Sequence, residues 1–485
     1  MFDVIVVGAG IVGSLIAREL SRYQLSIAVL EKEPDVGSVT TMANSAIVHS
    51  GYDPVPGTLK AKFNVLGNKM FDKLCEELDV EMKRIGSLTV ALYDEQLPIL
   101  EELAKRSAQN GVEVKILNAE ETLRIEPHLN PMVKGSLLAP TAGIVNPFTL
   151  CVHAMENAVD NGVKLFLIEK VVKIEKNSDF HNIICESGNS YECKVIINAT
   201  GVYSDDIHKL IEPIDYEIIP RKGEYFILDH YTDDLVNHTI FPLPSAKGKG
   251  ILVTPSIGGT YLVGPSAEAM PSKDDVSTDK VTLDEIKRQA LEMVPGIPFN
   301  QVIRTFAGTR PTPSTHDFII EFAKTDKDFI TMSGIESPGL VSSPALAEYV
   351  VNEFVSKVLE LVKKDDFNPN VTKRPNLQEM SVEEKNAFIK ANPEYGQIIC
   401  NCEKISLGEI LFEMNTSIPP TTIKAVKKRT RAGFGKCQGG FCQPLVTKII
   451  SKKFNIPLDK VLYQKTDSFI MPYKLKGGNK WLNVV

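Results

Sequence analysis

Four cysteines near the C-terminus have the residue type and spacing of metal ligands. Cys400 and Cys402 form one close pair, and Cys437 and Cys442 form another with two glycines between them. Two such pairs can enclose a [2Fe–2S] rhomb, one pair for each iron, and the glycines let backbone N–H groups point at sulfur. Structural zinc is the alternative, although zinc sites favour C-x-x-C over C-x-C, and free thiols are a third. The spacing therefore favours a centre that transfers single electrons.

A glycine-rich segment near the N-terminus has the spacing of a phosphate-binding turn. Gly8, Gly10 and Gly13 form the pattern G-x-G-x-x-G. Gly8 permits a tight turn, Gly10 lets the backbone approach a pyrophosphate at the start of a helix, and Gly13 allows close packing of helix on strand. Glu31 follows at the spacing of an acidic residue that binds an adenosine ribose. The pattern predicts a dinucleotide site without distinguishing FAD from NAD, and a glycine turn that serves packing alone is the alternative.

The segments around these motifs alternate between helix and strand patterns. An apolar strand at 2–7, a helical pattern at 11–23 and a strand at 27–30 form a βαβ unit with parallel strands. Similar units follow as a βα-type stretch at 163–174, a short strand and turn at 195–201, and a strand, glycine turn and helix at 329–358. Alternating strands at 217–228 and 250–263 suit an antiparallel sheet. This order predicts two interleaved domains.

Length, charge and apolar runs exclude several classes of protein. The 485 residues suffice for two or three domains, and the net charge of −7 leaves no global basic field for nucleic acid. No apolar run reaches the roughly 18 residues of a membrane helix. The apolar N-terminus carries Asp3 where a signal peptide would carry a basic leader. Because the cysteines lack the density of a disulfide scaffold, we expect a cytoplasmic protein, with peripheral membrane association only through a partner.

The order of several segments resembles that of the D-amino-acid-oxidase-like FAD oxidoreductases. The segments are Gly8 to Gly13, Glu31, TTMANS at 40–45, IVHSG at 47–51, GTRP at 308–311 and 334–340. The resemblance covers nearly all of residues 1–360 and implies FAD as the cofactor. It also implies that the 40–45 loop lies along the flavin and that backbone donors of 337–340 face the isoalloxazine edge, where reduction builds negative charge.

The predicted cofactor-binding residues combine the glycine motif with the segments that the resemblance assigns. They are Gly8, Gly10, Ile11, Val12, Gly13, Glu31, Lys32, Thr40, Thr41, Asn44, Ser45, Val171, Thr200, Gly201, Gly308, Gly334, Pro338, Gly339 and Leu340. Outside the first motif, a plain turn is the alternative interpretation of each glycine.

Three side chains are candidates for the substrate side of the site. Oxidation of an alcohol carbon by a flavin requires a base for the hydroxyl proton, and His49 has a suitable unperturbed pKa. Family members that oxidise glycerol 3-phosphate and 2-hydroxyglutarate carry a histidine in this segment. Arg310 lies between glycine and proline neighbours and offers a planar fork for carboxylate or phosphate, and Lys222 is a weaker candidate for holding an anion. A structural histidine and a surface salt bridge are the alternatives.

The late cysteines belong to a segment that resembles the BFD-type [2Fe–2S] domain, in the version attached to catalytic subunits of anaerobic glycerol-3-phosphate dehydrogenases. The second pair departs from the simplest BFD domains because it is C-x4-C and not C-x-x-C. Basic residues concentrate around it, and they either offset the charge of the cluster, dock a partner or form a solvated helix face. They are Lys424, Lys427, Lys428, Arg429, Arg431 and Lys436.

Together these observations predict a mixed α/β and α+β chain. We expect a discontinuous Rossmann-like FAD-binding domain at 1–85, 141–215 and 301–362, and a mainly antiparallel substrate domain at 86–140 and 216–300. A linker at 363–390, a helical BFD-like domain at 391–465 and a tail at 466–485 complete the chain.

The predicted activity is that of a flavin dehydrogenase that acts on a small anionic alcohol. Glycerol 3-phosphate is the first choice of substrate, a 2-hydroxy acid the second, and an amino or imino acid the third. Because an iron–sulfur cluster accepts electrons singly, we expect an electron-accepting subunit, carrier or quinone as partner and not oxygen. A non-catalytic electron-transfer subunit is the alternative.

Overall fold

The computed structural model describes residues 1–230, 235–244 and 250–471. The chain divides into two units, one of residues 1–32 with 36–373 and the other of 33–35 with 374 onward. The predicted tail lies outside the described residues from 472 on. Among the described residues, no helix combines the length and the apolar composition that crossing a membrane requires.

A largely parallel sheet is built around the N-terminal strand of the first unit. Strand β1 (Phe2–Val7) lies between β12 (Ser190–Asn198) and β2 (Ile27–Glu31), and all three run parallel. The sheet continues in parallel through β9 (Lys164–Leu167) and β20 (Phe329–Ser333). Its antiparallel edges are β10 (Val171–Lys176), β11 (His181–Cys185) and β19 (Ile319–Phe322). Because β1 and β2 are covered on both faces, they are apolar without alternation.

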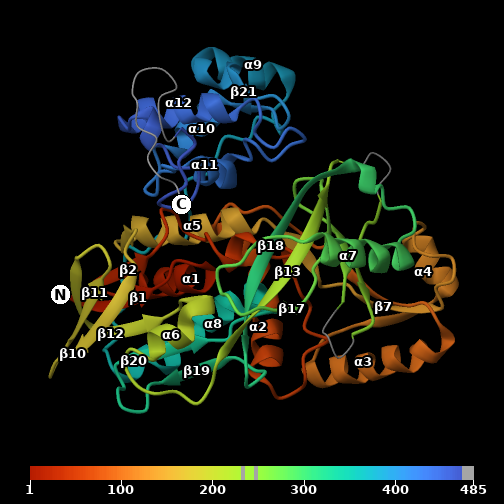
Figure 1. Cartoon of the computed structure of the whole chain (residues 1–485), viewed down its shortest axis with the longest axis horizontal. Helices are drawn as coiled ribbons and strands as arrows, with labels where there is room; N and C mark the ends of the chain where they lie inside the picture. The colour runs from red at the N-terminus through yellow and green to blue at the C-terminus, as the bar shows by residue number, and fades with distance from the viewer. Residues whose placement is uncertain (231–234, 245–249, 472–485) are drawn as a thin grey trace. The chain divides into compact units, whose positions relative to one another are not determined.

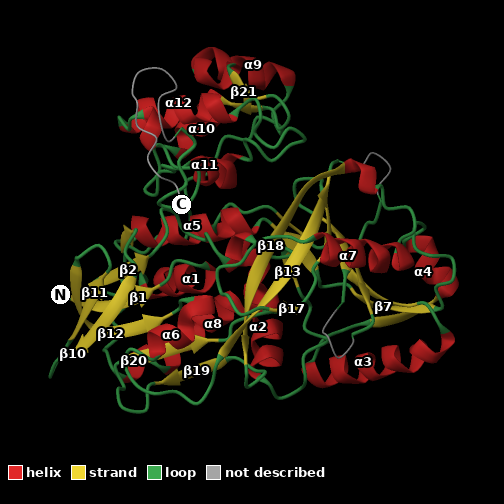
Figure 2. Cartoon of the chain, viewed as in Figure 1, coloured by secondary structure: helices red, strands yellow, loops and turns green. Residues whose placement is uncertain are grey.

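Helices pack closely on this sheet because glycines allow backbones to approach. Helix α1 (Ile11–Leu20) contacts α5 (Pro147–Asp160) and α8 (Gly339–Glu353), and α8 also contacts α2 (Leu59–Glu77). A Cβ on Gly67 of α2 would lie 1.9 Å from the carbonyl oxygen of Val341. A short helix, α6 (Ser204–His208), follows β12. Figure 2 shows these helices around the strands of the sheet.

The second sheet of this unit is mainly antiparallel. Its longest strands, β13 (Ile218–Leu228) and β18 (Val302–Pro313), pair along almost their whole length, and in Figure 1 they lie between the parallel sheet and β7. The other strands are β5 (Ser87–Ala91), β6 (Lys115–Asn118), β7 (Gly135–Ala139), β14 (Thr239–Pro242), β15 (Leu252–Pro255), β16 (Tyr261–Gly264) and β17 (Glu268–Ala269). The helices beside them are α3 (Leu97–Asn110), α4 (Ala119–Ile125) and α7 (Lys280–Met293).

The second unit is small and mostly helical. Its described elements are α9 (Val382–Ala391), β21 (Ile398–Cys400), β22 (Ile405–Ser406), α10 (Leu407–Glu413), α11 (Ile423–Thr430) and α12 (Gln443–Phe454). Ile410, Val426 and Ile450 are fully buried at its centre, and two of the four late cysteines join this apolar core.

The predicted fold class is confirmed, and one local expectation differs from the structure. The 163–174 stretch contains β9 and the start of β10 and no helix. Strand β18 lies within the range predicted for the FAD-binding domain and pairs with β13 of the antiparallel sheet. The domain limits themselves stay predictions.

Candidate functional site

The first unit contains a cavity of about 750 Å³ that is lined by loops and strands from both sheets. Most of the predicted cofactor residues line it: Gly8, Gly10, Ile11, Val12, Glu31, Lys32, Thr40, Thr41, Asn44, Ser45, Val171, Thr200, Gly201, Gly308, Pro338, Gly339 and Leu340. Gly13 and Gly334 are not in this lining. A Cβ on Gly13 would lie 1.9 Å from the oxygen of Gly8, and Gly334 adopts φ +68° beside Pro313, so both positions serve close packing.

The glycine turn leads directly into α1, as a nucleotide site requires. Gly8 has φ +101°, and a Cβ there would lie 2.7 Å from the carbonyl oxygen of Ala199. Gly10 immediately precedes α1 and lines the cavity, where a Cβ would contact the Thr41 hydroxyl oxygen at 3.4 Å, so the absence of a side chain helps a phosphate group to approach the N–H groups of the first helical turn. The carboxylate of Glu31 accepts the N–H of Ala9 at 2.8 Å and lines the cavity from the end of β2. The residues present therefore fit a bound dinucleotide.

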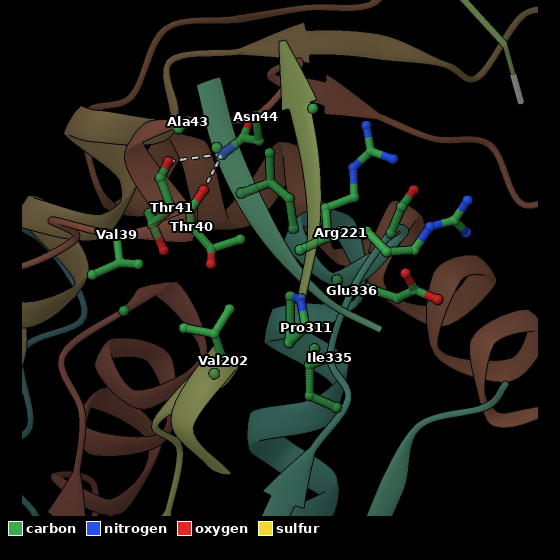
Figure 3. A pocket seen from close by; sticks show the side chains of 18 of the residues that line it. Val39, Thr40, Thr41, Ala43, Asn44, Val202, Arg221, Pro311, Ile335 and Glu336 are labelled. Carbon is green, nitrogen blue, oxygen red and sulfur yellow. Dashed lines mark hydrogen bonds between the residues drawn. The ribbon is translucent and has the colours of Figure 1, made fainter. Parts of the chain in front are cut away.

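The loop at 40–46 is fixed by its own side chains. The Thr41 hydroxyl accepts the N–H of Ile11 at 3.0 Å, and the Thr40 hydroxyl donates to the carbonyl of Thr309 at 2.9 Å. The Asn44 amide donates to the carbonyls of Thr40 and Thr41, which Figure 3 shows as dashed lines. Asn44 thus shapes the loop, and the backbone of the loop is held between α1 and β18.

The facing sides of β13 and β18 form a ladder of three cross-strand pairs. Arg221 pairs with Arg310, and Gly223 pairs with Gly308. Tyr225 pairs with Phe306, with stacked ring centroids 4.6 Å apart. The Arg310 guanidinium lies over Gly223, where a Cβ would be 2.9 Å from Nη2. Because Gly223 and Gly308 have no side chains, there is room for the Arg310 guanidinium beside Gly223 and for the loop at 40–46 beside Gly308.

Two arginines on neighbouring positions make one wall of the cavity cationic. Both Arg221 and Arg310 line the cavity, and Figure 3 shows Arg221 among the lining side chains. The Arg221 guanidinium donates to the carbonyl oxygen of Ala267, and the Arg310 guanidinium donates to that of Ser266, each at 3.3 Å. Like charges at facing positions of two strands are unfavourable unless an anion lies between or beside them. This wall is therefore suited to an anionic ligand.

His49 reaches the cavity from the segment that follows β3 (Ile47–Val48). The side-chain amides of Asn64 and Asn68, both on α2, donate to its carbonyl oxygen at 2.7 and 2.9 Å. Its ring packs beside Phe241, with centroids 5.9 Å apart. The Ser45 hydroxyl and the Tyr225 hydroxyl lie 2.9 Å apart in the same cavity. The buried asparagines fix the backbone from which the imidazole extends.

Lys222 does not line the cavity, contrary to our expectation. The alternation of β13 points it to the opposite face, where its ammonium lies 3.4 Å from both Glu224 and Asp275. Arg221, which the sequence analysis did not select, takes the place on the cavity side. The sequence does contain a pattern that points to Arg221. R-x-G-x-Y at 221–225 and F-x-G-x-R at 306–310 have arginine, glycine and an aromatic residue in opposite order, as expected for the paired faces of two antiparallel strands.

The four late cysteines form two neighbouring pairs, and each pair contains one cysteine of the C-x-C motif and one cysteine of the C-x4-C motif. The sulfurs of Cys402 and Cys437 are 3.6 Å apart. A hydrogen bond from the Cys442 thiol lowers the pKa of Cys400 to about 5, against the effect of burial. That Cys400 with Cys402, and Cys437 with Cys442, each ligate one iron stays a prediction. Cys400 and Cys442 are buried, whereas Cys402 is exposed.

This arrangement fits a dinuclear cluster better than a single metal ion. No three His, Cys, Asp or Glu side chains converge on one metal position within the described part of the chain. Backbone N–H groups of Phe441, Gly439 and Gly440 point at the Cys437 sulfur and hold its pKa below the ordinary value. Two thiolate pairs with N–H donors at sulfur are what a [2Fe–2S] cluster needs. Lys427 and Lys428, which we considered as an exposed basic face, are buried.

Comparison with known proteins matches both units. The DAO model, described as FAD dependent oxidoreductase, matches residues 3–353, and the BFD-like [2Fe-2S] binding domain model matches residues 398–452. A glycerol 3-phosphate dehydrogenase of Caloramator mitchellensis is 44% identical over 472 residues, which are 97% of this chain and 98% of that protein. A glycerol 3-phosphate oxidase of Mycoplasma genitalium is 36% identical over 76% of this chain and 97% of its own length.

A solved structure agrees with these matches. The dithionite-reduced L-α-glycerophosphate oxidase of Mycoplasma pneumoniae, with FAD bound, superposes with a TM-score of 0.74 at 30% identity over 77% of this chain and 99% of that one. The two expected cofactors, FAD and a [2Fe–2S] cluster, are those of the two matched models.

Proposed function

Because the chain belongs to the FAD dependent oxidoreductase (DAO) family, we propose that it is a dehydrogenase that oxidises sn-glycerol 3-phosphate to dihydroxyacetone phosphate. The observation that carries the proposal is a cavity in which a histidine and two arginines meet the predicted flavin loop. A phosphate dianion suits two guanidinium groups better than a single carboxylate does, since it offers three oxygens and two charges. The names of the matched relatives support the same substrate.

In this proposal the residues of the cavity divide the work between binding and proton transfer. When bound, FAD supplies the hydride acceptor, and the cluster held by the four cysteines supplies a one-electron outlet. Arg310 and Arg221 bind the phosphate and so orient the carbinol carbon. His49 accepts the hydroxyl proton at an imidazole nitrogen, and Asn64 and Asn68 keep its backbone in place. Ser45 and Tyr225 offer hydroxyl groups to the polyol.

The second unit favours a dehydrogenase over an oxidase. The relative named a dehydrogenase matches 97% of this chain, whereas the relative named an oxidase matches 76% although nearly all of its own length is used. The part of this chain beyond that match is therefore suited to passing electrons on to a partner protein or a quinone. We place the enzyme in the cytoplasm, where its cysteines stay reduced.

An anaerobic titration of the purified holoenzyme tests the proposal. Glycerol 3-phosphate should bleach the flavin absorbance, whereas glycerol, 2-hydroxyglutarate and amino acids at equal concentration should not. His49→Asn should slow the bleaching by about 100-fold or more, as expected for loss of a general base. His128→Asn is the matched control, because His128 lies outside the cavity and contacts the carbonyl of Leu235.

Two outcomes would overturn the proposal in different ways. Bleaching by 2-hydroxyglutarate and not by glycerol 3-phosphate would refute the substrate. Failure of every candidate to bleach a flavin that dithionite still reduces would favour a non-catalytic electron-transfer subunit.

A further inference from the structure

The surface near Cys402, which is exposed, and Cys437, which is partly exposed, carries an exposed aromatic side chain and several exposed lysines. Phe441 lies between the ligands Cys437 and Cys442, and 83% of its surface is exposed. Its backbone N–H points at the Cys437 sulfur, which is 3.6 Å from the sulfur of exposed Cys402. Phe441 therefore lies beside Cys437, which is partly exposed and neighbours the exposed Cys402, while Cys400 and Cys442 lie within the core.

Apolar and basic side chains continue from Phe441 along α12. Leu445 is 43% exposed, and Lys448 and Lys452 follow it at helical spacing on the exposed side. Lys404 and Lys436 are exposed next to Cys402 and Cys437. We call Phe441, Leu445, Lys404, Lys436 and Lys448 the exit surface.

The segment that carries the exit surface has a net charge opposite in sign to the net charge of the whole chain. Residues 398–454 contain ten lysines and arginines and three glutamates, a net charge of +7, whereas the whole chain carries −7. Lys427, Lys428 and Arg429 are buried at their side chains, whereas five lysines are exposed: Lys404, Lys436, Lys448, Lys452 and Lys453. None of the three glutamates is exposed. Glu403 pairs with Arg431, and Glu409 caps α10. A partner that docks here therefore meets a locally positive surface with an apolar centre, the composition of a protein interface with charged residues at the rim.

We propose that the exit surface docks an acidic one-electron carrier protein, with Phe441 as the apolar anchor and the lysines as the steering charges. The proposal rests on the proposed function for its source of electrons. Each substrate oxidation releases two electrons and two protons, so two carrier molecules are each reduced by one electron. Phe441, as an exposed aromatic side chain between two of the residues that would hold the cluster, would bring the carrier against Cys437 and the exposed Cys402.

The test uses two haem proteins of opposite charge as probes, the acidic soluble domain of cytochrome b5 and basic cytochrome c. Holoenzyme reduced with glycerol 3-phosphate, or in parallel with dithionite from which excess is removed, is mixed with each ferric probe in a stopped-flow instrument. The reduction rate of cytochrome b5 should fall with ionic strength, and that of cytochrome c should rise or stay constant. Because the slopes are compared, the difference in driving force between the probes does not matter.

Variants separate docking from the other steps. Lys404→Glu with Lys448→Glu should slow reduction of cytochrome b5 about tenfold at low salt, and the difference should vanish at high salt. Phe441→Ala should weaken docking about tenfold, as for an exposed aromatic anchor. Lys390→Glu and Val382→Ala are the matched controls, because both residues are exposed on α9 of the same unit and lie outside the exit surface. Iron content and the electron paramagnetic resonance spectrum verify that every variant keeps its cluster.

The outcomes distinguish this proposal from its rivals. Equal rates for wild type and exit-surface variants with intact clusters at all salt concentrations would overturn it. Variants that lose binding to anionic phospholipid vesicles but still reduce cytochrome b5 normally would show a membrane-docking surface and would also overturn it. Failure of glycerol 3-phosphate alone, with docking of the dithionite-reduced protein retained, would refute the proposed substrate and leave the exit surface supported.

Discussion

Replacement of Arg221 by methionine tests whether the paired arginines recognise phosphate. Arg221 faces Arg310 across β13 and β18, and both line the cavity. Methionine keeps an unbranched side chain of similar reach and removes the guanidinium. The next residue of the strand, Lys222, supplies the matched control, because Lys222→Met removes a cation from the opposite face.

The structure sets the size and the sign of the expected effects. A charge-assisted hydrogen bond contributes about 1.5–3 kcal/mol, so Arg221→Met should lower kcat/KM for glycerol 3-phosphate by roughly 10- to 150-fold. Removal of one of two like charges at facing strand positions should leave the ligand-free protein as stable as before, or more stable by a few tenths of a kcal/mol. Lys222→Met should have the opposite pattern, with a loss of stability and no loss of kcat/KM. It leaves Glu224, whose pKa is already raised by burial, without its cation and should cost about 3 kcal/mol of stability at unchanged kcat/KM.

Steady-state kinetics and thermal unfolding of the same preparations check this contrast. Rates are measured with glycerol 3-phosphate and with glycerol at high concentration, and unfolding is followed with and without inorganic phosphate. Phosphate should raise the Tm of wild type more than that of Arg221→Met. The reasoning is refuted if Arg221→Met lowers the rates with both substrates equally, or if it lowers the Tm of the ligand-free protein as much as Lys222→Met does.

Three further changes probe other parts of the structure. Gly308→Ala would place a Cβ 2.3 Å from the carbonyl oxygen of Ala43, so the loop at 40–46 must move. We expect this to weaken flavin binding by about 1–3 kcal/mol, seen as less flavin retained after gel filtration. Gly296→Ala is the control, because a Cβ there has nothing within 4 Å, and this variant should retain flavin. Cys437→Ser should lose the iron absorbance and carrier reduction but keep flavin bleaching by substrate, whereas Cys75→Ser should keep all three. The carboxyl of Asp326 is buried, yet hydrogen bonds from Lys176 and His181 outweigh that burial and lower its pKa. Its stabilising effect is thus complete above about pH 4 and is lost as the pH falls through the lowered pKa, so the difference in unfolding free energy between wild type and Asp326→Asn should be large at pH 7 and shrink in acid.

The sequence predicted the parts of the fold that local patterns determine. Strand, glycine turn and helix at the N-terminus are fixed within about thirty residues, since each glycine has a steric reason that needs no distant partner. By contrast, β18 pairs with β13 across the intervening residues 229–301, a stretch of 73 residues. Its sequence is compatible with either sheet, so periodicity alone could not assign it.

The direction of side chains was harder to predict than their position in the sequence. On β13, charged residues occupy both faces, so a period of two could not say whether Arg221 or Lys222 enters the cavity. At the cysteines, spacing gives the number of ligands and not which sulfurs are neighbours. The turn after β21 exposes Cys402 and leaves Cys400 in the core, and this difference in burial only exists in the folded unit.

The ladder on β13 and β18 offers a physical reason why this fold could accept the phosphorylated substrate that we propose. Its glycine pair removes two side chains at the level where the loop at 40–46 packs, so the positions on either side of it define the two ends of the cavity wall. One end carries stacked aromatic rings, and the other carries two guanidinium groups. We expect exchange of the arginines to change the charge that the wall accepts, while the loop stays held against Gly308, where a Cβ would meet Ala43. We therefore expect substrate choice to depend on strand positions 221 and 310, and cofactor placement to depend on position 308.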